Sequence, residues 1–210
     1  MDQADLEGSA EAIYKLAGKD PDEPLATPQL AFAWLGADAI EVVPRFRMKA
    51  PAKSARVYGR PRIFVREGLD AVQLNFFVGH ELAEEFLRRE GYAGEDIEHA
   101  ANYIGAALVA PRRPFLASIR EVGEDWTEQA ARFVATESLV ALRFGEIVRA
   151  PLSLVTPIQV RVRGPEAFVW PDEMTIRSWA SGRAPRGLVK ARLRDDRRRI
   201  LLRADDDETG

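Results

Sequence analysis

The spacing of apolar residues changes several times along the first 150 residues, which predicts helices interrupted by a small sheet. The first predicted helix closes at Gly18. The second begins with Thr27 as its N-cap and Pro28 at the first position. The predicted elements of this part are helices over residues 9–17 and 27–35, a strand over 39–43, and a hairpin of 56–58 and 62–65 around Gly59-Arg60.

Longer helical patterns follow the hairpin. Asp70 with Gln73 forms a capping-box pair that predicts a helix running to about residue 90. A second helix is predicted over Asp96–Val109 and ends before Pro111. Shorter helical patterns over residues 127–134 and 137–148 complete this part, so we expect an α+β domain over residues 1–150.

The pattern shifts to short strands after Pro151, which predicts a small β-rich addition over residues 151–210. Residues 188–193 and 200–203 flank a charged turn, and we expect them to pair as an antiparallel hairpin. The remaining predicted elements are a strand over residues 158–162 and a short helix near 171–179.

Composition narrows the class of protein. With 46% hydrophobic and 30% charged residues, the chain is an ordinary globular protein and is not disordered throughout. A net charge of −3 gives no overall attraction to nucleic acid or to a membrane. The chain contains no cysteine, which excludes disulfides and thiolate metal sites. Without an apolar run of roughly 20 residues or a signal sequence, we expect no membrane association and a cytoplasmic location.

The sequence His-Glu-Leu-Ala-Glu on the first long helix is the main candidate for chemistry. His80 and Glu84 are four residues apart, so on a helix both side chains point the same way and could hold one metal ion. Glu81 projects beside them, where it could hold a water molecule as a general base. The alternative is a charged helix face with one incidental histidine, because so short a motif also arises by chance.

The second long helix adds a further carboxylate. Glu98 lies on a face with Ala101 and Gly105, whose small size would let another helix approach closely. Glu98 could then be a third metal ligand, with Asn102 as its supporting partner. The alternative is a surface acid near a helix N-terminus, where the helix dipole favours negative charge.

Together these segments resemble the ImmA/IrrE family of bacterial and phage metallopeptidases. Residues 75–84 are similar to the family's R-F-T-x-A-H-E-x-x-H stretch, and residues 98–111 to its E-x-x-A-N-x-F-A-x-x-L-x-x-P stretch. The resemblance covers roughly residues 9–148. It implies a zincin-like fold, a zinc ion, and cleavage of a repressor or partner protein in a stress, phage or mobile-element switch. It also implies that His80 and Glu98 are ligands and that Glu81 is the general base.

Two residues depart from the family pattern. Glu84 replaces the second histidine, and Asn75 replaces the common arginine. One imidazole with two carboxylates makes a harder, more anionic site, which should hold zinc less tightly and tolerate manganese better. His99 is expected to be a supporting or a surface residue, because it points about 100° away from Glu98 around the helix. A regulator that keeps the fold and binds a partner without cleaving it is therefore the alternative.

Two segments raise the question of nucleic-acid binding. Residues 127–148 resemble a helix-turn-helix pair, in which Arg143 could contact DNA. In the C-terminal hairpin, Lys190, Arg192 and Arg194 would share one face and could meet phosphate. The alternatives are a helix pair that only packs and a strand edge protected by charge.

Overall fold

The computed structural model describes residues 1–94, 96–149, 152–155, 160–163, 172–182, 188–193 and 200–204. It divides into two compact units, and each is considered by itself. Unit 1 comprises Met1–Gly123 with Ala131–Ala135, and unit 2 comprises Glu124–Ala130 with Thr136–Gly210. The domain boundary expected at residue 150 stays a prediction. None of the helices in the described residues is long and apolar enough to cross a bilayer.

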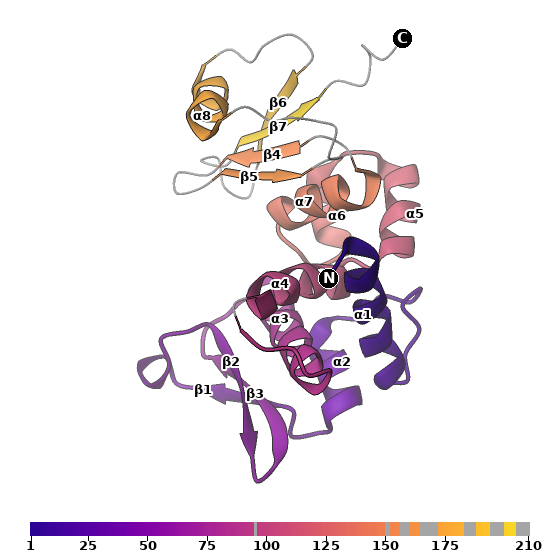
Figure 1. Cartoon of the computed structure of the whole chain (residues 1–210), viewed down its shortest axis with the longest axis vertical. Coiled ribbons are helices and arrows are strands. Elements are labelled where there is room, and N and C mark those ends of the chain that lie inside the picture. The colour runs from indigo at the N-terminus through magenta and orange to yellow at the C-terminus, as the bar shows by residue number, and fades with distance from the viewer. Residues whose placement is uncertain are drawn as a thin grey trace. The chain divides into compact units, whose positions relative to one another are not determined.

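Unit 1 combines helices with a three-stranded sheet. Its elements are α1 (Gln3–Leu16), α2 (Thr27–Leu35), β1 (Ile40–Val43), the short 3₁₀ helix η1 (Arg45–Arg47), β2 (Ala52–Val57), β3 (Arg60–Arg66), α3 (Ala71–Arg89), α4 (Asp96–Val109) and α5 (Arg112–Val122). Helices α3 and α4 lie side by side, with β1–β3 to one side of α3 and with α1 and α2 to the other (Figure 1). The α+β class predicted from the sequence is confirmed.

The sheet has the order β1-β3-β2, with β1 parallel and β2 antiparallel to β3. The predicted hairpin is confirmed, but its turn residues are Tyr58 and Gly59, both with positive φ (50° and 78°). Such a pair of left-handed residues suits a two-residue hairpin turn. Ile63 and Val65 are buried on β3, so the face of the sheet that carries them joins the core.

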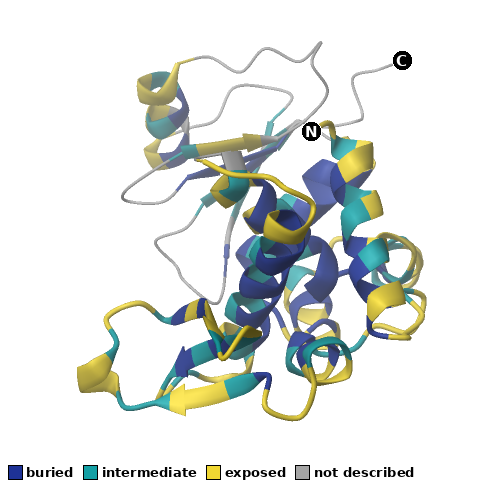
Figure 2. Ribbon diagram, turned by 60° about the horizontal axis from the view of Figure 1, so that its bottom comes forward, coloured by how far each residue is buried: buried dark blue, intermediate teal, exposed yellow. Residues whose placement is uncertain are grey.

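Helix α3 is the centre of the core of unit 1. Its N-terminus has the predicted capping box, in which Asp70 accepts from the Gln73 backbone and Gln73 accepts from the Asp70 backbone. Val78, Leu82 and Leu87 of α3 are fully buried. The inner helices of unit 1 are largely dark blue, the colour of buried residues, in Figure 2. A helix this buried fixes the directions of the polar side chains that it carries.

Asn75 is buried at 3% exposure and joins three segments of unit 1. Its side-chain oxygen accepts from the Thr27 backbone N–H at 2.7 Å, and its amide nitrogen donates to the carbonyls of Phe133 (3.2 Å) and Val134 (3.1 Å). The Thr27 hydroxyl donates to the Asn75 carbonyl, so Thr27 does not act as the N-cap; Ala26 holds that position. The residue that replaces the family's arginine thus has a structural role.

Two helices differ from the sequence-based prediction. Helix α1 begins at Gln3, six residues before the predicted Ser9, because Asp2 and Asp5 form a capping box there. Helix α5 was not predicted at all. Pro111 follows the end of α4 and is also the N-cap of α5. We interpreted this proline only as the end of a helix, so the start of α5 directly after it was missed.

Unit 2 combines a helix pair with an antiparallel sheet. Its elements are α7 (Glu137–Val148), β4 (Leu152–Val155), β5 (Val160–Arg163), α8 (Glu173–Ser181), β6 (Leu188–Arg192), β7 (Ile200–Ala204) and most of α6 (Trp126–Arg132). The strand order is β5-β4-β7-β6, and β6 and β7 pair as the predicted antiparallel hairpin. Ile176 and Ala180 of α8 pack against Val155 and Leu202 of the sheet.

The position of Arg143 differs from the expectation that this residue contacts DNA. The residue lies on α7, where its side chain has 0% exposure, and its guanidinium is 3.7 Å from the carboxylate of Glu146. A guanidinium buried to this extent cannot reach a phosphate. The prediction that Arg143 contacts DNA is therefore wrong.

Candidate metal centre

The structure brings His80, Glu84 and Glu98 together from two helices. His80 and Glu84 lie one turn apart on α3, with 3.5 Å between His80 Nε2 and Glu84 Oε1. Glu98 comes from α4, and its Oε1 lies 3.7 Å from the same nitrogen. One ring nitrogen therefore faces two carboxylates that are far apart in the sequence.

Two glycines make this approach of the helices possible. A Cβ atom at Gly105 of α4 would lie 3.0 Å from the backbone nitrogen of His80 and 3.1 Å from its Cα. A Cβ atom at Gly79 of α3 would lie 3.2 Å from the Gly105 carbonyl oxygen. The two backbones are thus in direct contact beside His80. The small residues predicted on this face of α4 let the two helices approach closely, and this approach places Glu98 beside His80.

Glu81 is buried and turned towards β2. Its Oε2 accepts a hydrogen bond from the Ser54 backbone N–H at 2.5 Å. Its carboxylate, the His80 ring and Glu84 each offer a ligand atom, and these atoms lie within 4.8 Å of one another. Burial raises the pKa of Glu81, although the hydrogen bonds to Ser54 act in the opposite direction. No sequence signal points to Ser54, because its contact with Glu81 depends on the tertiary position of the edge strand β2.

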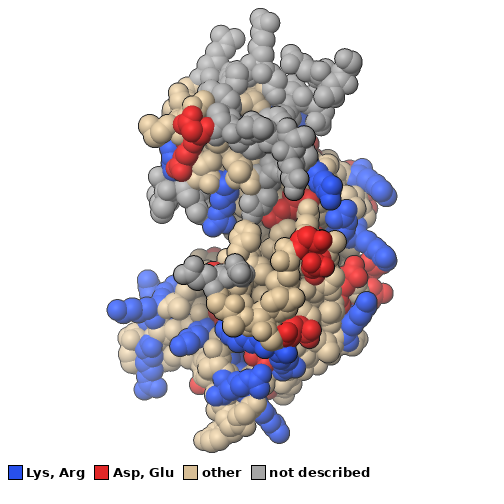
Figure 3. Space-filling view, viewed as in Figure 1, with Lys and Arg blue, Asp and Glu red and all other residues tan. Residues whose placement is uncertain are grey.

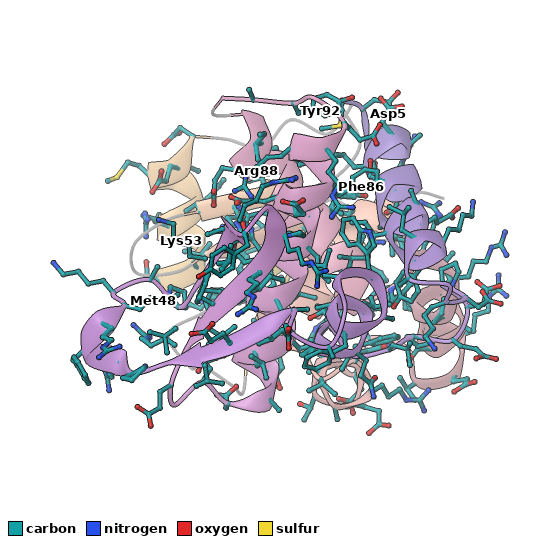
Figure 4. The ribbon with its side chains drawn as sticks, turned by 90° about the horizontal axis from the view of Figure 1, so that it is seen from below. Asp5, Met48, Lys53, Phe86, Arg88 and Tyr92 are labelled. Carbon is teal, nitrogen blue, oxygen red and sulfur yellow. The ribbon has the colours of Figure 1, made fainter. Side chains whose placement is uncertain are left out.

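Arg88 is a second residue that sequence reasoning missed. Its guanidinium pairs with Glu84 one turn earlier on α3, and it also donates to the Ser54 hydroxyl at 2.7 Å. Figure 4 labels Arg88 where it extends from α3 towards the sheet. The i, i+4 spacing of Glu84 and Arg88 was visible in the sequence. The candidate metal centre thus includes a cation of the protein itself.

The carboxylates set the electrostatics of the imidazole. Burial alone would lower the pKa of His80, but the hydrogen bond with Glu84 and the charges of Glu98, Glu81 and Glu84 outweigh it and raise the pKa. The His80 contact is also the main cause that lowers the pKa of Glu84, with Arg88 contributing. The negative potential that favours a proton on His80 also attracts a divalent cation, which must replace that proton to bind the ring nitrogen.

The expected supporting residues differ in what they do. The Asn102 amide donates to the Glu98 backbone carbonyl at 2.8 Å and lies 3.5 Å from the Glu98 side chain, so it can orient that carboxylate. His99 is exposed on α4, and within the described residues no hydrogen bond or ion pair connects it to the cluster. His80 Nδ1 is buried without a hydrogen-bond partner among the described groups.

The expected basic face of the C-terminal hairpin is described only in part. Lys190 is half-buried, and its ammonium group donates to the Gly182 carbonyl at 2.8 Å. The side chain of Arg192 and the whole of Arg194 lie outside the described residues. A role for these three residues in binding nucleic acid stays a prediction.

The residues present fit a small divalent cation, because His80, Glu81 and Glu84 offer ligand atoms within 4.8 Å of one another and Glu98 adds a carboxylate 3.7 Å from His80 Nε2. Ligands bound tetrahedrally at about 2.1 Å stand about 3.4 Å apart. The separations of 3.5 Å and 3.7 Å around His80 Nε2 are close to that spacing before any adjustment. One imidazole and two carboxylates form a donor set that zinc and manganese both accept.

The contact between α3 and α4 is tested by Gly105→Ala. We expect this variant to lose about 1–3 kcal/mol of unfolding free energy, because the added methyl group forces the helices apart. Glu98 should retreat from His80, and metal affinity should fall with it. Urea denaturation and calorimetric zinc titration measure the two effects.

Gly8→Ala is the matched control for Gly105→Ala. A Cβ atom at Gly8, inside α1, meets no atom within 4 Å. This substitution should therefore stabilise the protein by about 0.5–1 kcal/mol, because alanine loses less conformational freedom in a helix. If Gly105→Ala behaved like Gly8→Ala, the glycine contact would not hold the site together.

A comparison with known protein families finds a match to part of the chain. A family model described as the IrrE N-terminal-like domain, a peptidase family, matches residues 39–144, which include His80, Glu81, Glu84 and Glu98. No curated protein matches the chain.

A solved structure, a Mycobacterium tuberculosis transcriptional regulator, is similar with a TM-score of 0.59 and 19% identity over 89% of this chain. The chain spans 64% of the length of that regulator. At this level of identity the likeness shows the fold, and it confirms the expected zincin-like α+β architecture.

Proposed function

Because the chain belongs to the family of the IrrE N-terminal-like domain, we propose that it is a metal-dependent endopeptidase that cleaves a regulatory protein. The main support for this proposal is the arrangement of side chains around His80. His80 Nε2 faces the carboxylates of Glu84 and Glu98, while Glu81 lies within the same cluster. The protein substrate would be a repressor or another partner in a stress, phage or mobile-element switch. The absence of cysteine agrees with a reducing, cytoplasmic location.

His80, Glu84 and Glu98 would hold the metal ion. Zinc bound there would supply the Lewis acidity that polarises a peptide carbonyl. With two carboxylates in place of two imidazoles, we expect weaker zinc binding than in a two-histidine site and a greater tolerance of manganese. Asn102 would help to orient the Glu98 carboxylate, whose Oε1 lies 3.5 Å from the Asn102 amide nitrogen.

Glu81 would act as the general base. Its carboxylate would take a proton from the attacking water molecule and pass it to the leaving amine. Burial raises its pKa, which brings a carboxylate closer to the range in which it can both accept and return a proton. The hydrogen bond from the Ser54 N–H would fix the direction of the carboxylate.

A catalytically inactive regulator is the second candidate, and Arg88 favours it. The guanidinium already neutralises Glu84, and it reaches the Ser54 hydroxyl next to Glu81. A cation of the protein could thus replace the metal ion as the partner of Glu84. The domain would then bind a protein partner without cleaving it.

Metal binding is measured by calorimetric titration with zinc and manganese. We expect one ion per chain in the wild type, a loss of at least about tenfold in affinity for Glu98→Gln, and a gain for Glu84→His, since imidazole is the softer ligand. Glu67→Gln removes an exposed acid outside the cluster and should leave affinity unchanged. Absence of metal from the wild type, with zinc binding created only by Glu84→His, would favour the inactive regulator.

Catalysis is tested by Glu81→Gln, which removes the proposed base but none of the three proposed ligands His80, Glu84 and Glu98. Cells that produce the wild type should contain protein fragments with new N-termini, and cells that produce Glu81→Gln should lack them. Mass spectrometry of protein N-termini detects the difference, and zinc titration of Glu81→Gln confirms that the metal site is intact. Identical fragments in both strains would exclude Glu81 as the general base.

A further inference from the structure

The sheet of unit 1 carries a charge opposite to that of the chain. Residues 39–66 contain eight lysines and arginines and a single glutamate, whereas the whole chain has a net charge of −3. Figure 3 shows lysine and arginine side chains gathered over β1–β3, at the lower left of the view. This concentration of positive charge lies outside the residues that form the metal centre.

The alternation of side chains along β3 creates one face of this region. Ile63 and Val65 are buried in the core, so the residues that alternate with them lie on the opposite face of the strand. These outward residues are Arg60, Arg62, Phe64 and Arg66. Lys53 of β2 pairs in register with Phe64 and therefore adds its charge beside that ring.

The 3₁₀ helix η1 and the residues after it extend the positive charge. Arg45 and Arg47 are exposed on η1, and Lys49 is exposed a short distance along the chain. The Arg66 guanidinium donates to the Lys49 carbonyl at 2.8 Å, which joins this segment to β3. We call Arg45, Arg47, Lys49, Lys53, Arg60 and Arg66 the basic face.

The charges of the basic face are available to a ligand. Arg62 is the exception on this surface, because Asp38 and Glu41 lie 3.6 Å and 3.4 Å from its guanidinium. In the described part of the chain, no ion pair involves any of the six residues of the basic face. Six cations without an acidic partner in one surface region strongly attract a polyanion.

Exposed aromatic rings accompany these cations. Phe46 is 85% exposed, with the Arg47 guanidinium 5.7 Å from its ring centre, and Tyr58 at the hairpin tip is 100% exposed. Phe64 is half-buried between the outward arginines of β3. Large exposed rings gain nothing for folding, but they can stack on the bases of an unpaired strand.

We propose that the basic face binds single-stranded nucleic acid, with its cations on the phosphates and Phe46 and Tyr58 on the bases. An acidic protein segment would satisfy the cations but would leave the rings without a role. A duplex keeps its bases stacked inside and offers the rings little contact. This activity is separate from the proposed peptidase activity, because it uses none of the residues of the metal centre.

Fluorescence anisotropy with a fluorescein-labelled thymidine 20-mer tests the electrostatic part. We expect Arg47→Glu/Lys53→Glu to weaken binding at least tenfold. The slope of log affinity against log salt should fall by about 1.4 for two lost contacts, at about 0.7 for each. Lys19→Glu/Arg120→Glu is the matched control, because it makes the same charge change at exposed sites outside the basic face. Equal losses in both double variants would show a general charge effect and overturn the proposal.

The stacking part is tested by Phe46→Ala, which should weaken binding of the 20-mer about tenfold without a change in the salt slope. Phe32→Ala, at a partly exposed ring on α2, should have no effect. Circular dichroism checks that each variant is folded.

Competition experiments identify the class of ligand. Unlabelled thymidine or uridine 20-mers should displace the probe, which would support the proposal for DNA or RNA. A 20-base-pair duplex and poly-glutamate should compete weakly. Tighter binding of the duplex, or equal competition by poly-glutamate, would overturn the assignment to single-stranded nucleic acid.

Discussion

The direct contact of α3 and α4 at Gly79 and Gly105 is the constraint on which the candidate metal centre depends. Any side chain at either position would push one backbone away from the other. Glu98 is on α4 and His80 is on α3, so the length of the contact between them depends on this crossing. The site is therefore a property of helix packing as much as of the motif on α3.

Positive charge is the second requirement of this centre. Three carboxylates surround one imidazole, and their repulsion must be relieved by a proton on His80, by Arg88 or by a metal ion. The structure shows Arg88 on Glu84, while among the described residues the Asn102 amide and the His80 ring are the groups that lie near the Glu98 carboxylate. Of the three proposed ligands, Glu84 is the one that a metal ion would have to win from Arg88. His80 Nε2 and Glu98 already face each other, with no cation of the described residues between them. The balance between these cations distinguishes an enzyme from an inactive relative.

The sequence predicted those parts of the fold that depend on local pattern. The capping box at Asp70, the hairpin around Gly59 and the pairing of β6 with β7 all follow from residues close together in the chain. Helix α5 was missed because Pro111 was interpreted only as a helix end, although proline also favours a helix start.

The parts that the sequence did not predict depend on tertiary contacts. The position of Glu98 could be anticipated because small residues mark a close helix face. The partners of Glu81 and Asn75 could not, since Ser54 and Phe133 reach them from distant segments. Burial of Arg143 likewise depends on how α7 packs, which periodicity does not specify. The charge of residues 39–66 was visible in the sequence, but only the strand register shows which of those side chains share a face.

A crystal structure of the zinc-soaked protein, with anomalous diffraction at the zinc edge, tests the candidate metal centre most directly. We expect one anomalous peak bound by His80 Nε2, Glu84 and Glu98 at about 2.0–2.2 Å, with Arg88 displaced from Glu84. A zinc peak elsewhere in the protein, or no peak with Arg88 still paired to Glu84, would contradict this expectation.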